Sequence, residues 1–161
     1  MDTNTTLTFG ELEVTSFEVD HDPVRPAVGY RFDYRGRSVV ISGDSVVTDS
    51  LTDIATGADL LLHDALSLPI VQGLERGMAG SRMEHILLDI QNYHAHTSDL
   101  GELVADSGVK QLILYHLVPP PGNALFEKIF ARDVPEGTVI SIDGMIVELP
   151  AGSESIDVIY P

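Results

Sequence analysis

Hydrophobic and polar positions alternate along the first quarter of the chain, as they do in half-buried strands. Residues 5–9 alternate weakly and residues 12–19 more clearly, with a break of phase at Ser16-Phe17 that predicts a bulge. Two further short runs flank Arg35-Gly36-Arg37, which is a hairpin turn signal. We therefore expect residues 5–43 to form an antiparallel meander.

The pattern changes after this region to short apolar runs that alternate with helical periods. Continuous apolar runs at residues 59–63 and 111–115 predict strands that are buried on both faces. Thr97-Ser98 is placed to cap a following helix that Gly108 ends. Helices are expected at residues 48–56, at 66–92 with a loop near 77–80, at 99–107 and at 124–131.

The last part of the chain reads as a hairpin followed by a tail. Residues 139–142 and 145–149 are strand-like and flank Asp143-Gly144, a favoured turn dipeptide. The tail, residues 151–161, is also strand-like in part but has no evident partner strand. Strands followed by β-α-β units predict one α/β domain over residues 1–161, with a mixed sheet and helices on one face. The other face of such a sheet needs a partner.

Composition and charge restrict the chemistry. The chain has no cysteine, which excludes disulfides, zinc fingers and thiol nucleophiles, so any metal site must use His, Asp or Glu. The net charge of −16 disfavours a nucleic-acid partner, because a phosphate backbone would be repelled. We expect a cytoplasmic protein without a membrane span, because the start of the chain is no signal peptide and its apolar runs are short.

Three strand-like runs end in a potential metal ligand, namely His21, Asp44 and His116. A ligand at a strand end lies at the rim of a sheet, and α/β sheets usually place their sites there. Two imidazoles and one carboxylate are a credible set for a metal such as zinc. Alone, each has an ordinary alternative: a surface histidine, a turn or helix-capping aspartate, and a core histidine bonded to a carbonyl.

Two further histidine strings are candidates for acid–base chemistry. Asp64 follows His63 at the end of a buried run, and a carboxylate beside an imidazole fixes its tautomer. In His94-Ala95-His96, an extended backbone would put both rings on one face. We expect His96 to be the acid–base group and His94 to be incidental.

The order of these strings resembles the carboxyl-terminal half of the metallo-β-lactamase-fold hydrolases. The likeness is greatest to the branch that includes ribonuclease Z and arylsulfatase-like enzymes. The strings are His21 followed by Gly29-Tyr30-Arg31-Phe32, then Ser42-Gly43-Asp44, His63-Asp64-Ala65, His96-Thr97-Ser98 and Tyr115-His116.

The resemblance implies half of an αββα sandwich and a centre of two zinc ions in the complete parent. By resemblance, His21 binds one metal, Asp44 bridges both and His116 binds the second. His96 then assists the leaving group or steadies the phosphate, and Asp64 orients it. The metal would activate a water molecule by lowering its pKa to about 7.

One departure from the family is large, because its dense motif His-x-His-x-Asp-His has no match in this sequence. That motif belongs to the amino-terminal half, so we expect a fragment, a truncated product or one half of a split protein. Two expectations follow: a hydrolase region acting on a phosphodiester, sulfate ester, lactone or similar small substrate, with activity of the isolated chain doubtful; or an inactive association module. The uncovered sheet face predicts a homodimer or higher oligomer, or a missing amino-terminal half as partner.

Overall fold

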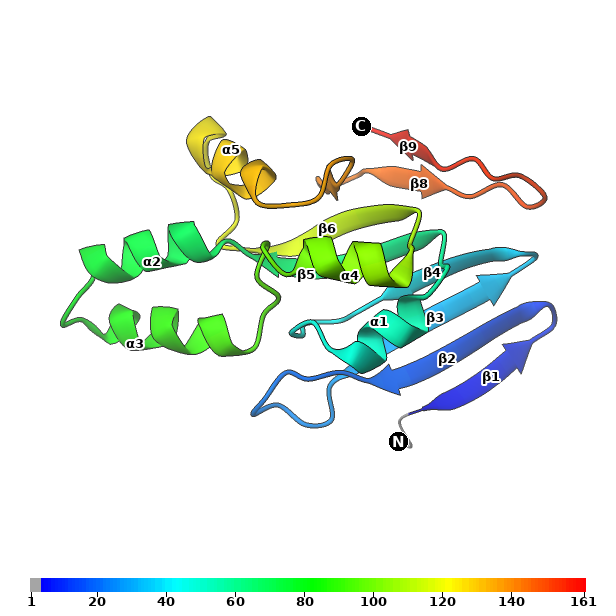
Figure 1. Ribbon diagram of the computed structural model, residues 1–161, viewed down its shortest axis with the longest axis horizontal. Coiled ribbons are helices and arrows are strands. Elements are labelled where there is room, and N and C mark those ends of the chain that lie inside the picture. Colours follow the sequence, from blue (N-terminus) through cyan, green and yellow to red (C-terminus); the bar gives the residue numbers. More distant parts are fainter. Residues whose placement is uncertain (1–3) are drawn as a thin grey trace.

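Seven strands form one mixed sheet in the order in which they occur along the chain (Figure 1). The computed structural model describes residues 4–161, so most of the segment used to judge the absence of a signal peptide lies outside the described residues. The antiparallel strands are β1 (Thr5–Phe9), β2 (Leu12–Glu18), β3 (Val28–Tyr34) and β4 (Arg37–Ile41). The parallel strands that follow are β5 (Leu60–Leu66), β6 (Gln111–Val118) and β7 (Val139–Ile140). The predicted meander is confirmed.

The bulge predicted at Ser16-Phe17 is wrong. Ser16 pairs with Tyr30 and Phe17 with Gly29, without any shift of register along β2. The side chain of Phe17 is buried in the core. Its ring lies against Gly29, where there would be no room for a side chain. The phase break in the sequence therefore reflects a packing requirement and not an extra residue.

The helices form close to where their periodicity places them. They are α1 (Asp49–Ala55), α2 (Leu68–Gly77), α3 (Arg82–Asp89), the short 3₁₀ turn η1 (Ile90–Asn92), α4 (Leu100–Ser107) and α5 (Ala124–Arg132). Thr48 caps α1 through its side chain, which accepts a hydrogen bond from the Leu51 amide at 3.2 Å. Gly108 ends α4 in the left-handed conformation with φ 63°. The cap predicted from Thr97-Ser98 is wrong, because Asp99 is the N-cap residue of α4.

One face of the sheet carries the main core. Helices α1 and α4 lie side by side in front of the strands (Figure 1). Their buried side chains, Leu51, Leu100 and Leu103, belong to one cluster with Val40 and Leu61 of the central strands. Leucine and valine of this kind contribute roughly 1.5–3 kcal/mol each when they are fully buried. The prediction of a mixed sheet with helices on one face is confirmed.

The hairpin predicted across Asp143-Gly144 is wrong, although the turn itself is present. The Met145 amide donates to the Ile142 carbonyl at 3.1 Å, and Gly144 has φ 85°. The strand before the turn, β7, joins β6 in parallel. The segment after it, β8 (Ile146–Glu148), pairs with β9 (Asp157–Ile159) in a separate two-stranded sheet. The tail therefore has a partner strand.

No helix among residues 4–161 is long and apolar enough to cross a membrane.

Candidate active site

Asp44 and His116 meet at the edge of the sheet where the parallel strands end. The Nε2 atom of His116 lies 3.4 Å from the Oδ2 atom of Asp44, and both side chains are about half exposed. Gly43 turns the chain into Asp44 with φ 72°, and a Cβ atom there would lie 2.8 Å from the carbonyl oxygen of Val28. Only glycine fits this position, so the turn directs Asp44 toward the end of β6.

His116 is the extra residue of a β-bulge. Tyr115 pairs with Asp64 and Leu117 pairs with Ala65, which leaves His116 without a counterpart on β5. Its φ of 43° is rare for a residue with a side chain. Bulges and strained backbones of this kind re-aim side chains at functional sites. The bulge accounts for an exposed imidazole at a position next to a buried strand.

Three histidine rings and one tyrosine ring form a chain beside this pair. The ring of His94 lies 5.4 Å from that of His116 and 5.5 Å from that of His21, between ring centroids. Tyr93 lies 4.8 Å from His21 and 5.0 Å from His94. The Nδ1 atom of His21 is buried and has no hydrogen-bond partner within the described residues. His21, predicted as a ligand because a strand-like run ends there, therefore contacts the same His94 ring as His116 does.

A buried carboxylate orients His94. Asp64 is fully buried, and its Oδ2 atom accepts a hydrogen bond from Nδ1 of His94 at 2.8 Å. It also accepts from the Ser45 amide at 3.2 Å and lies 3.0 Å from Nδ1 of His63. Burial alone would raise the pKa of Asp64, but the hydrogen bonds from His63 and His94 and from the Ser45 amide lower it below its ordinary value. The hydrogen bond between Nδ1 of His94 and this buried carboxylate fixes the orientation of the His94 ring.

His96 has different partners from those expected. Its Nε2 atom donates to the Gln91 carbonyl oxygen at 2.9 Å, and its backbone forms an isolated parallel bridge with Leu66. The bond to Asp64 that was expected to orient His96 is made by His94. Sequence reasoning passed over His94, and the spacing of the two histidines held no signal to choose between them. The role of His96 stays a prediction.

The side chains that could bind a metal ion do not form a complete site within the described residues. Within residues 4–161, no three His, Asp or Glu side chains are grouped closely enough to hold a metal. Asp44 and His116 face each other, and His21 has an orphaned ring nitrogen nearby, but these do not converge on one point. The described residues therefore do not form a complete metal site by themselves.

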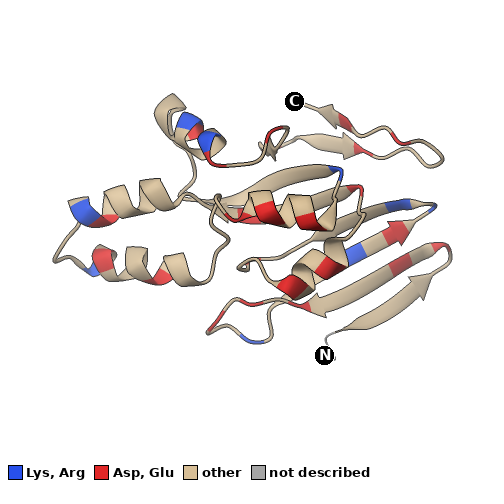
Figure 2. Cartoon of the chain, in the orientation of Figure 1, with Lys and Arg blue, Asp and Glu red and all other residues tan. Residues whose placement is uncertain are grey.

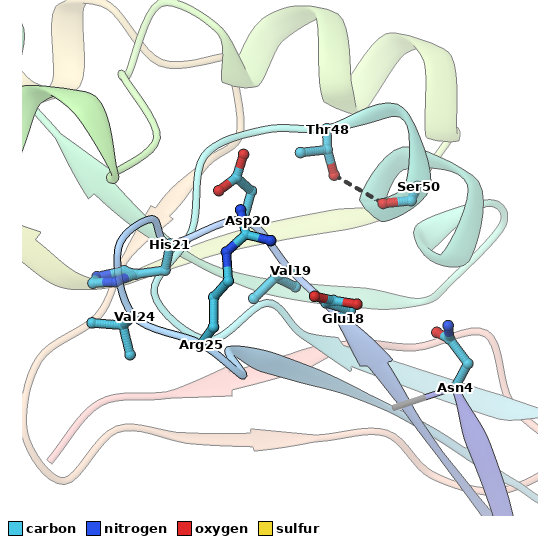
Figure 3. A pocket seen from close by; sticks show the side chains of 9 residues that line it. All are labelled: Asn4, Glu18, Val19, Asp20, His21, Val24, Arg25, Thr48 and Ser50. Carbon is cyan, nitrogen blue, oxygen red and sulfur yellow. Dashed lines mark hydrogen bonds between the residues drawn. The ribbon is translucent and has the colours of Figure 1, made fainter. Parts of the chain in front are cut away.

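His21 also borders a polar pocket of about 380 Å³ between the end of β2 and the start of α1 (Figure 3). The other side chains that line it include Glu18, Asp20, Arg25, Thr48 and Ser50. Thr48 and Ser50 are joined through their hydroxyl groups at 3.1 Å. The pocket makes His21 reachable from solvent.

Comparison with known sequences identifies a family. The family described as beta-lactamase superfamily domain matches residues 1–117. A ribonuclease Z of Mycobacterium avium (strain 104) is 36% identical over 100 residues, which are 62% of this chain and 33% of that protein. A putative ribonuclease Z of Mycobacterium tuberculosis (strain CDC 1551 / Oshkosh) is 35% identical over 103 residues, 64% of this chain and 42% of its own length. The chain thus spans between 33% and 42% of the length of these two curated relatives.

Solved structures show the same fold at lower identity. The metallo-beta-lactamase fold protein YhfI from Bacillus subtilis superposes with a TM-score of 0.59 at 21% identity, covering 87% of this chain and 50% of that one. Zn(2+)-bound PqqB from Methylobacterium extorquens gives 0.67 at 18% identity, covering 92% of this chain and 55% of that one. With its family match over most of its length and its sheet and helices arranged as in these structures, the chain belongs to the metallo-β-lactamase-fold superfamily.

Proposed function

We propose that this chain carries part of the catalytic centre of a metal-dependent hydrolase, which cleaves a small ester substrate with a water molecule. The observation that carries the proposal is the juxtaposition of two functional pairs at the ends of the parallel strands. One pair is Asp44 with His116, and the other is Asp64 with His94. Ring contact between His94 and His116 links the pairs.

Each residue has a proposed role that follows from its surroundings. Asp44, His116 and His21 are proposed as metal ligands, the first two because they face each other and the third because its buried Nδ1 atom has no partner within residues 4–161. His94 is proposed as the group that moves a proton at its Nε2 atom, with Asp64 as its positioning residue. His96 was assigned this proton-moving role from sequence, and its bond to the Gln91 carbonyl favours His94 instead.

The remaining ligands are proposed to come from outside this chain. The partial donor set and the limited share of the relatives' length that is matched both support this. A missing amino-terminal half or a second copy would complete a centre for zinc, two ions in the complete protein. Activity of the isolated chain is accordingly expected to be weak or absent.

The substrate is proposed to be a small molecule. The relatives are named ribonuclease Z, which argues for RNA and against the expectation that nucleic acid is no partner. The net charge of −16 argues the other way, because polyanion binding needs clustered cations. Helices α1 and α4, which cover one face, carry acidic and no basic bands (Figure 2).

Zinc binding to the purified chain tests the proposal. We expect Asp44→Asn combined with His116→Gln to reduce zinc affinity at least about tenfold, since losing even a residue that only supports a metal ligand typically costs about 10–100-fold. His85→Gln is the matched control, because His85 is exposed on α3. Equal zinc binding by the double variant and the control would contradict the ligand roles. Two tightly bound zinc ions per chain, together with diester hydrolysis, would contradict the proposal that the remaining ligands come from outside this chain.

A second candidate function is an association module without activity. It is favoured by the sheet face opposite the helices, where Leu7 and Phe9 of β1 are 53% and 62% exposed. Such a surface commonly marks an interaction site. The oligomeric state of the purified chain tests whether this face binds a second copy.

A further inference from the structure

A second hollow lies beside His116. The loop after β6, helix α5 and the end of β7 surround it, and its volume is about 710 Å³. Small-molecule sites in proteins commonly measure about 300–1,000 Å³. The hollow is continuous with the Asp44–His116 pair because His116 forms part of its wall.

The walls of this pocket are mostly apolar. They are formed by Leu117, Pro120 and Pro121 after the bulge, and by Ile140 and Ile142 at the end of β7. The side chain of Ile142 is 51% exposed, so a ligand that covers it would remove apolar surface from water. The two prolines fix their own backbone angles, which makes this wall stiff.

The charges at the pocket do not suit an anion. Glu127 and Asp143 line it together with Lys128, so carboxylates outnumber the single ammonium group. Helix α5 carries both basic and acidic bands (Figure 2). The net charge of −16 adds a repulsive field for any anionic group. An uncharged ligand can contact the apolar wall without this electrostatic repulsion.

We propose that this pocket binds the uncharged, apolar part of a small carboxylic ester or lactone, either an aliphatic chain or an aryl group. The ester carbonyl would then lie toward His116 and Asp44, within the site described above. The proposal rests on the proposed hydrolase function for its choice of an ester. The binding of an apolar group is separate from that function and needs neither metal nor turnover.

Two fluorescent probes that differ in one charged group test this pocket on the full chain. N-phenylnaphthylamine is neutral, and anilinonaphthalene sulfonate is its sulfonated analogue. We expect the neutral probe to bind at least about tenfold more tightly. Ile142→Asp should weaken binding of the neutral probe about tenfold, because it puts a charge against the apolar wall. Phe9→Asp, which alters exposed apolar surface on β1, should change it less than about twofold.

Each other outcome overturns a stated part of the proposal. Equal binding of both probes would refute the preference for an uncharged ligand. Unchanged binding in Ile142→Asp, or loss of binding only in Phe9→Asp, would place the apolar site elsewhere. Circular dichroism confirms that each variant is folded. Equal zinc affinity of the Asp44→Asn/His116→Gln variant and the His85→Gln control would refute the proposed ligand roles while the probe results stand, so the two failures are distinguishable.

Discussion

Residue spacing indicates a shared face only where the backbone is a regular strand. His94 and His96 stand two apart, which would align their rings in an extended segment. Their segment is irregular and has only an isolated bridge, between Leu66 and His96. The two rings consequently bond to different partners, Asp64 and the Gln91 carbonyl. The sequence could locate the histidine pair but not the member that meets the carboxylate.

A double-mutant cycle measures which histidine is coupled to Asp64. Asp64→Asn with His94→Leu should show an interaction energy of about 1–3 kcal/mol in the free energy of unfolding, because the two side chains share a buried hydrogen bond. The matched cycle of Asp64→Asn with His96→Leu should stay within about 0.5 kcal/mol of additivity. Urea unfolding of the single and double variants gives these values. A larger coupling for His96 than for His94 would restore the role predicted from sequence.

Gly29 is required by close packing and not by its backbone angle. A Cβ atom there would lie 2.4 Å from Cζ of Phe17 and 2.8 Å from the carbonyl oxygen of Ile41. Gly29→Ala should therefore destabilise the fold by about 1–3 kcal/mol, the usual cost of overpacking. Gly101→Ala in α4 has open space and should stabilise the helix by about 0.5–1 kcal/mol. Thermal unfolding of both variants tests the contrast, and two shifts of the same sign would contradict it.

At the scale of elements, the bulge on β6 shows what a single sequence cannot supply. The apolar run predicts a strand that stops at Tyr115, whereas β6 continues to Val118 past the extra residue His116. A bulge is defined by the register of two strands far apart in sequence, so no local pattern announces it. The same limit explains the wrong bulge at Ser16-Phe17. What could be predicted was that His116 would lie close to the end of a strand, and its role as a metal ligand stays a prediction.

The C-terminal segment is held to the sheet by a buried ion-pair network. Arg37 on β4 lies 3.3 Å from Asp59 and donates to the carbonyl oxygens of Ser153 and Ser155. Lys110 lies 3.0 Å from Asp59. Burial alone would raise the pKa of Asp59, but the bonds from Lys110 and the Ser38 amide and the charge of Arg37 lower it below 3.8.

This network makes stability fall in acid. A carboxylate whose pKa is lower in the folded state contributes stability above pH 3.8, and that contribution is lost as the pH falls through the folded value. Asp59→Asn should cost about 3 kcal/mol at pH 7, because it leaves a buried arginine uncompensated, and should flatten the fall below pH 4. Asp106→Asn, exposed on α4, is the control and should lie within about 0.5 kcal/mol of the parent. Urea unfolding from pH 7 to pH 3 checks both, and an equally steep acid limb in Asp59→Asn would argue against this assignment.

At the scale of the molecule, the change of periodicity along the chain was enough to predict the layered architecture. Alternation gives the meander, and buried runs between helices give the parallel strands, because each pattern matches what its element must bury. The pairing at the end of the chain was not predicted correctly. Strand β7 has only two residues, and it pairs with β6 instead of with the segment that follows it in the sequence. Strand β8 pairs with β9 after the chain reverses direction between them. The sequence contains turn signals there, but they do not show which strands pair.

The face of the sheet opposite the helices is the surface on which we expect self-association. Cross-strand partners share a face, so Leu7, Val14 and Phe32 lie in one row, and Phe9 and Leu12 extend it. This apolar strip (Leu7, Phe9, Leu12, Val14 and Phe32) is the surface through which we expect a second copy to bind. The expectation follows from its exposure, because Leu7 and Phe9 are both more than half exposed.

Association through the apolar strip should respond to salt in the opposite direction from a polar interface. Two chains that each carry −16 repel each other, and raising the salt from 0.1 M to 1 M shortens the screening length from about 10 Å to about 3 Å. Light scattering at micromolar concentration should therefore find a dimer or higher oligomer that tightens with salt. Phe9→Asp should give a monomer, while Leu125→Asp, at an exposed leucine on α5, should not. A monodisperse monomer at both salt concentrations would contradict self-association through this strip.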